Sequence, residues 1–231
     1  MGFNKTVHQW ENAAESFAAD QERSEYADCN KAVVKNRFKL LHGEAVLDLG
    51  CGYGYYTEYF RSIGGEVVGV DGAESMIRIA KNRYPSCSFS IVDILEPLPF
   101  AESSFDILFC NQVLMDIERI EALLRECHRI LKTGGIFYYS IVHPAFYHGK
   151  WQVDEKGCKY AKAISLYRSE YTLQNHFWGE TAHFHRPISH YLNAAADAGF
   201  ALKHTDEPKC YDGVMKNADL PLFFFAEYIK P

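Results

Sequence analysis

The feature that most constrains the fold is an alternation of short apolar runs with helix-like segments between residues 44 and 143. Strand-length apolar runs occupy residues 45–49, 66–70, 88–92, 105–110 and 136–142, and helical patterns occupy 53–63, 73–83 and 117–131. Such alternation favours right-handed crossovers and a mostly parallel sheet with helices on both faces. The sequence therefore predicts an α/β, Rossmann-like fold.

The segments outside this core complete one predicted domain, residues 1–231. Residues 1–43 form an N-terminal helical cap, with one helix expected over 8–41 and a stop at His42-Gly43. Residues 144–186 are an aromatic-rich insertion with no clear period, expected to act as a lid, a substrate wall or a dimer contact. In 187–231 we expect a helix up to Ala198, then strands near 200–204 and 222–229.

Composition narrows the possible functions. The 231 residues carry a net charge of −6, which argues against a broad nucleic-acid surface. Seven cysteines without a C-x-x-C pair indicate reduced thiols and a cytoplasmic protein. We expect no membrane span. The pair His183 and His185 lacks further ligands at metal-site spacing, so no metal is expected.

The most informative segment is 46–54, an apolar strand that ends in the pattern Gly50-x-Gly52-x-Gly54. Glycines at this position allow a tight turn and close approach of a ligand. Asp71 ends the next strand and is placed to accept hydrogen bonds from ribose hydroxyls. Asp48 would repel a dinucleotide pyrophosphate, whereas it suits a ligand with an ammonium or sulfonium group.

With these residues the sequence resembles the class I S-adenosylmethionine-dependent methyltransferases. Segments 46–54, 67–77, 91–94, 98–107 and 131–135 match the motifs of that family in order. The resemblance implies a seven-stranded sheet with an antiparallel last strand, for which 222–229 is well placed. It also implies S-adenosyl-L-methionine as cofactor, S-adenosyl-L-homocysteine as product, and direct in-line transfer of the methyl group.

The resemblance further implies a set of cofactor-binding residues. Asp48 would lie near the methionine amino group, Asp71 would bind the ribose, and Met76 would pack by the adenosine. Asp93 and Ile94 would read the adenine, and Asn111 would face the methyl region. The predicted set is Asp48, Gly50, Cys51, Gly52, Gly54, Asp71, Gly72, Met76, Asp93, Ile94 and Asn111.

Candidate acceptor-side residues follow from position. His143 comes just after the fifth strand and is either a general base or a turn cap before Pro144. Arg186 is either an anion clamp or the partner of a surface acid. We expect the acceptor to be a small molecule. Its binding site would be lined by Tyr26, Tyr147, His185 and Arg186.

Three alternatives to this function stay open. A non-enzymatic S-adenosylmethionine-binding module fits the same motifs, whereas a nicotinamide-dependent oxidoreductase fits them less well. A nucleic-acid methyltransferase is disfavoured by the charge and by residues 111–114, which do not resemble an Asn-Pro-Pro-Tyr tetrad. A monomer and a homodimer are both compatible with the sequence.

Overall fold

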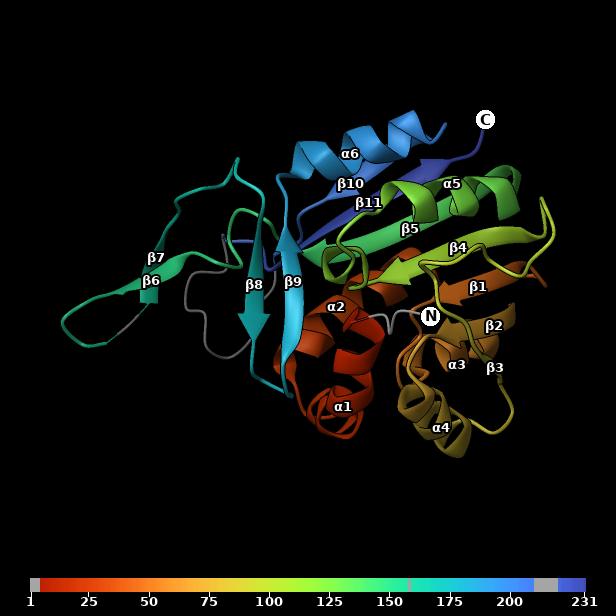
Figure 1. The fold of residues 1–231 in the computed structure, drawn as a ribbon, viewed down its shortest axis with the longest axis horizontal. Coiled ribbons are helices and arrows are strands. Elements are labelled where there is room, and N and C mark those ends of the chain that lie inside the picture. The colour runs from red at the N-terminus through yellow and green to blue at the C-terminus, as the bar shows by residue number, and fades with distance from the viewer. Residues whose placement is uncertain (1–4, 158, 210–219) are drawn as a thin grey trace.

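The computed structural model describes residues 5–157, 159–209 and 220–231, and its centre is a seven-stranded sheet (Figure 1). Its strands are β1 (Ala45–Leu49), β2 (Glu66–Asp71), β3 (Ser88–Ile91), β4 (Phe105–Asn111), β5 (Leu131–Val142), β10 (Ala201–Asp206) and β11 (Phe223–Ile229), in the order β10-β11-β5-β4-β1-β2-β3. The strands β1 to β5 pair in parallel, and β11 is antiparallel to both β5 and β10. The predicted α/β sheet with an antiparallel last strand is confirmed.

Helices cover both faces of this sheet. They are α1 (Lys5–Asp20), α2 (Glu25–Arg37), α3 (Tyr55–Ser62), α4 (Glu74–Arg83), α5 (Glu121–Ile130) and α6 (Ile188–Asp197), with a short 3-10 helix, η1 (Leu114–Asp116). Successive strand residues point to opposite faces. Phe109 packs towards α2 and α3, whereas its neighbours Leu108 and Cys110 pack towards α5 and α6.

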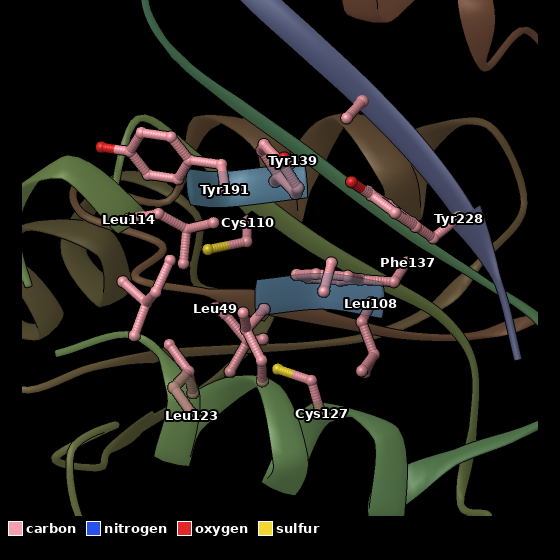
Figure 2. Close-up of a cluster of buried hydrophobic side chains, with 14 of the residues drawn as sticks. Leu49, Leu108, Cys110, Leu114, Leu123, Cys127, Phe137, Tyr139, Tyr191 and Tyr228 are labelled. Atoms are coloured by element: carbon pink, nitrogen blue, oxygen red, sulfur yellow. The ribbon is translucent and has the colours of Figure 1, made fainter. Parts of the chain in front are cut away.

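The core on the α5 side is the larger cluster of buried residues. Leu49 and Leu108 lie above Leu123 and Cys127 of α5, and the aromatic rings of β5 and β11 extend this cluster towards Tyr191 of α6 (Figure 2). Because the central strands are apolar on both sides, they are buried on both sides. This packing fixes the carboxyl ends of the strands, where the polar residues of the motifs gather.

The N-terminal region differs from its prediction. The expected single helix over 8–41 is wrong, because a turn at 21–23 separates α1 from α2. Ser24 begins α2 as its N-cap, and its side chain accepts a hydrogen bond from the backbone N–H of Ala27. Beyond Arg37 the chain is extended, which buries Phe38 against the sheet.

The aromatic-rich insertion forms two β-hairpins, which the sequence did not predict. Strands β6 (Lys150–Val153) and β7 (Lys159–Ala163) pair, as do β8 (Tyr171–Asn175) and β9 (Thr181–His185). The β6–β7 hairpin projects away from the sheet, whereas β9 contacts both α1 and η1 (Figure 1). Among the described residues, no helix is long and apolar enough to cross a membrane.

Candidate active site

A pocket opens where the carboxyl ends of β1, β2 and β4 meet α1, α2 and the β9 hairpin. Its empty volume is about 1300 Å³, its open mouth included, which is ample for a nucleoside-sized ligand. Ten of the predicted site residues line it: Asp48, Gly50, Cys51, Gly52, Asp71, Gly72, Met76, Asn111, Tyr26 and Tyr147. The structure therefore brings most of the predicted cofactor residues to one cavity.

The glycine turn after β1 approaches the loop after β4 very closely. Gly50 and Gly52 have φ values of +68° and +53°, a region that favours glycine. A Cβ atom built on Gly50 would lie 2.5 Å from a methyl carbon of Val113. At Gly72 only the space is restricted, because a Cβ atom there would lie 2.7 Å from a methyl carbon of Val7 of α1.

Two carboxyl groups lie on this side of the pocket. Asp71 accepts hydrogen bonds from the backbone N–H of Gly52 at 3.0 Å and of Ala73 at 2.9 Å, which orients its carboxylate at the end of β2. Asp48 is buried and accepts a bond from the Thr57 hydroxyl at 2.7 Å. These hydrogen bonds fix the positions of both carboxyl groups.

Burial dominates the electrostatics of these acids. It raises the pKa of Asp48 to about 7, with a further contribution from the charge of Asp71 and an opposing one from the Thr57 hydrogen bond. Burial also raises the pKa of Asp71, against the hydrogen bonds from Ala73 and Gly52. A cationic ligand in the pocket would favour the ionised form of both groups.

The N-terminal helix α1 closes the pocket from outside. Its Glu11 accepts bonds from the backbone N–H and the hydroxyl of Ser75, at the start of α4. Its Trp10 and Phe17 pack against Trp178, which follows β8, with Phe17 and Trp178 only 4.9 Å apart between ring centroids. An aromatic wall from two distant segments therefore covers the mouth.

A polar network forms the floor of the pocket, and sequence reasoning missed most of it. Ser140 of β5 donates to Asn111 at 2.6 Å and accepts from Gln112 at 2.9 Å, while Asn30 of α2 donates to the same hydroxyl at 3.3 Å. Tyr56 donates to Asn30 at 2.5 Å. Gln112 has a φ of +59°, which marks local strain in the loop after β4.

Three of the predicted cofactor residues do not line the pocket. Gly54 starts α3, and a Cβ atom there would lie 2.7 Å from Phe89, so the glycine permits close packing against β3. Asp93 accepts a bond from the backbone N–H of Leu95, and Ile94 packs at the edge of the core. The roles of Asp93 and Ile94 towards the adenine stay predictions.

Three predicted acceptor-side residues also lie outside the pocket lining. His143 accepts a bond from the backbone N–H of Ala145 through Nδ1, and its Nε2 lies 2.6 Å from Glu207, which is the arrangement of a turn cap. His185 stacks on Tyr171 with its Nε2 3.0 Å from the carbonyl of Tyr167.

Arg186 is buried, and backbone carbonyls occupy its guanidinium group. It donates to the carbonyls of Ile117, Glu118 and Phe184, which fastens the end of β9 to the loop after η1. Arg186 therefore stabilises the packing of β9 and is not oriented to bind an anion.

Asp116 and His183 line the pocket and were not among the predicted site residues. Asp116 could have been predicted from the sequence, because it is the one acid inside the apolar run 113–117. His183 gave no such signal, since the four histidines between 176 and 190 look alike. Within the described part of the chain, no group of three or more His, Cys, Asp or Glu side chains could hold a metal ion.

Comparisons with known proteins agree with this geometry. The family described as "Methyltransferase domain" matches residues 47–139. The fold is similar to the crystal structure of an S-adenosylmethionine-dependent methyltransferase from Mesorhizobium loti, with a TM-score of 0.76, 25% identity, and coverage of 87% of this chain and 97% of that one. The fold and the pocket thus define a class I methyltransferase domain.

Two curated relatives match a shorter stretch. A malonyl-[acyl-carrier protein] O-methyltransferase of Hamiltonella defensa is 32% identical over 41% of this chain and 36% of its own length. A ubiquinone biosynthesis O-methyltransferase of Coxiella burnetii is 32% identical over 46% and 47%. The alignments span 20% to 48% of the first curated relatives. The likeness to these relatives is therefore confined to the methyltransferase domain and leaves more than half of each relative unmatched.

Proposed function

We propose that this protein transfers a methyl group from S-adenosylmethionine to a small-molecule acceptor. The observation that supports this most is the pair of oriented carboxyl groups, Asp48 and Asp71, beside the glycine turn at Gly50 and Gly52. Together they present acceptors for an ammonium group and for ribose hydroxyls along one wall. The two relatives named above are O-methyltransferases, which supports oxygen as the acceptor atom.

The residues of the pocket suit such a cofactor. Asp71, held by two backbone N–H groups, keeps lone pairs free for the hydroxyls of a ribose. Asp48 would meet the ammonium group, and Met76 would pack by the adenosine. When bound, S-adenosylmethionine supplies a methyl group that is already activated on a sulfonium. The protein's own work is then alignment and exclusion of water, to which the aromatic wall contributes.

The proposal is tested by titration calorimetry with S-adenosylmethionine and S-adenosylhomocysteine, with NADH as the comparison ligand. We expect the first two to bind and Asp71→Ala to lose most of that binding. Asp197→Ala, at the exposed end of α6, is the matched control and should bind as the parent does. Binding of NADH alone would overturn the proposal in favour of an oxidoreductase.

Turnover separates an enzyme from a binding module. Release of S-adenosylhomocysteine in the presence of an acceptor panel is expected for the parent protein and not for Asp71→Ala. Tight cofactor binding with no methyl transfer to any acceptor would leave a binding protein instead.

A further inference from the structure

Two buried polar groups in the pocket wall take no part in the proposed cofactor contacts. Asp116 and His183 are 4% exposed each. The Nδ1 atom of His183 has no hydrogen-bond partner among the described residues, and the nearest polar atom to Asp116 Oδ1 that the structure gives is His183 Nε2, at 3.1 Å. A buried polar atom without a partner costs about 1–3 kcal/mol, so the His183 Nδ1 atom in the pocket wall points to a ligand group that hydrogen-bonds it.

The two groups come from different elements and meet at one point. Asp116 ends η1, and His183 lies in the middle of β9. The His183 Nε2 atom approaches Asp116 Oδ1 to 3.1 Å. The Tyr147 ring packs on the His183 ring at 5.6 Å between centroids, and Trp10 lines the same pocket. Elements far apart in the sequence thus hold the pair in place.

This pair lines the same pocket as most of the predicted cofactor residues. Asp116 belongs to the same loop as Asn111, whose predicted position is beside the transferable methyl group. Its backbone N–H donates to the carbonyl of Val113, the residue that packs on Gly50. The loop therefore connects the glycine turn to the Asp116–His183 pair within one pocket.

We propose that the Asp116–His183 pair is the acceptor subsite, and that it binds and deprotonates a phenolic hydroxyl group. This deepens the proposed function and rests on it. The acceptor hydroxyl would donate to the pair while the Tyr147 and Trp10 rings contact its aromatic ring. The hydroxyl oxygen then forms its bond to the methyl carbon as the carbon–sulfur bond of the sulfonium breaks, and the hydroxyl proton passes to the Nδ1 atom of His183, whose Nε2 faces Asp116.

The acidic and basic side chains that line the pocket favour a neutral acceptor over an anionic one. Among the described lining residues three are carboxylic acids, Asp48, Asp71 and Asp116. The one Lys or Arg side chain among them, Lys31, donates its ammonium hydrogens to Asp28 and to the carbonyl of Gln21. A carboxylate or phosphate would therefore meet acids on the pocket wall, and the lysine there already has an acidic partner. Such acceptors are also ionised already and need no base, whereas a hydroxyl does.

Burial disfavours the charged form of both groups of the pair. It lowers the pKa of His183 to about 4 and raises the pKa of Asp116 well above its ordinary value. A bound sulfonium cation favours ionised Asp116, which prepares the pair to take a proton. The other titratable groups that influence Asp116, or are influenced by it, are Asp71, Cys110, Tyr147 and Tyr191.

The first test measures binding without turnover. Phenol and benzoate are titrated by calorimetry into the protein saturated with S-adenosylhomocysteine, since the two probes share a ring and differ in charge. We expect phenol to bind at least tenfold more tightly than benzoate, and Asp116→Asn or His183→Gln to remove that preference. His190→Gln, a histidine of α6 outside the pocket lining, is the matched control and should retain it. Tighter binding of benzoate overturns the proposal.

The second test measures methyl transfer to phenol, to aniline and to 4-nitrophenol. Both variants should lower kcat for phenol by about 10²-fold or more while changing the S-adenosylmethionine affinity little. The loss should shrink at high pH and for 4-nitrophenol, because these acceptors ionise without a base. A merely structural role would lower all rates alike.

The outcomes separate this inference from the proposed function. Absence of S-adenosylmethionine binding in the parent protein would refute both. Cofactor binding with transfer to aniline in preference to every phenol, or phenol rates unchanged in both variants, overturns the acceptor subsite and leaves methyl transfer standing. Cofactor binding without transfer to any phenol overturns the subsite as well.

Discussion

Gly50 shows how a single residue connects the two halves of the pocket. Its φ of +68° admits glycine with little strain, and its missing side chain lets Val113 approach. Gly134 has a similar φ of +78°, but a Cβ atom there would meet nothing within 4 Å. An alanine at Gly134 would therefore meet backbone strain alone, whereas an alanine at Gly50 would meet both backbone strain and a steric conflict.

We expect Gly50→Ala to lower the affinity for S-adenosylmethionine at least tenfold and to destabilise the fold more than Gly134→Ala does. The latter should lose about 1 kcal/mol through backbone strain alone, with unchanged affinity. Calorimetry and thermal unfolding of both variants check this. Adding Val113→Ala to Gly50→Ala should recover part of the loss, and equal effects of the two glycine variants would contradict the explanation.

Site residues that lie at the end of a recognisable strand could be predicted from the sequence. Residues that meet only through the tertiary fold could not. Asp48, Gly50 and Asp71 occupy adjoining strand ends, so an apolar strand followed by glycines marks them directly. Asp116 and His183 are 67 positions apart, and nothing local indicates that they meet. Asn30 and Tyr56, in the pocket floor, were missed for the same reason.

At the scale of elements, the same distinction explains which strands and helices were predicted. The strands of the sheet are continuous apolar runs, because helices bury them on both faces. The hairpin strands β8 and β9 are short, with polar and aromatic residues mixed, so they have no clear period. The break between α1 and α2 depends on one capping contact at Ser24, which a helical pattern on both sides conceals.

The β8–β9 hairpin and α1 support each other through Trp178. Its indole N–H donates to Asp20 at 3.1 Å, and its ring packs on Trp10 and Phe17. The preceding residue, Phe177, is 72% exposed. The two neighbouring aromatic residues are therefore a matched pair for testing whether this contact closes the pocket.

Trp178→Ala should weaken the cover that α1 forms over the pocket, because it removes the central ring of the aromatic wall. We expect faster hydrogen exchange in α1 and weaker binding of S-adenosylmethionine, with a loss of about 1–2 kcal/mol in stability. Phe177→Ala should leave both quantities unchanged. If exchange in α1 is the same in the two variants, the hairpin does not hold the helix in place.

At the scale of the whole molecule, a charged group joins the beginning of the chain to its end. Glu227 of β11 is 3% exposed, and its carboxylate accepts from Arg37 of α2 at 2.8 Å and lies 3.1 Å from the Lys203 ammonium of β10. Burial opposes ionisation of Glu227, yet hydrogen bonds from Arg37 and Lys203 hold its pKa below the ordinary value. Since α2 carries Asn30 and Tyr26 to the pocket, this contact also positions a pocket wall.

Arg37→Gln should therefore destabilise the protein by about 1–3 kcal/mol, because a buried carboxylate loses its bidentate partner and keeps only Lys203. The comparison is Arg61→Gln, which breaks a bidentate pair of the same type with Glu58 on the exposed surface of α3 and should change stability little. Urea unfolding at neutral pH measures both.

Acidification should narrow the difference between Arg37→Gln and the parent protein, since protonated Glu227 no longer requires a cation. A constant difference down to the pH at which Glu227 is protonated would mean that the Arg37 stem, packed over the Phe38 ring, supplies the stability instead of its charge.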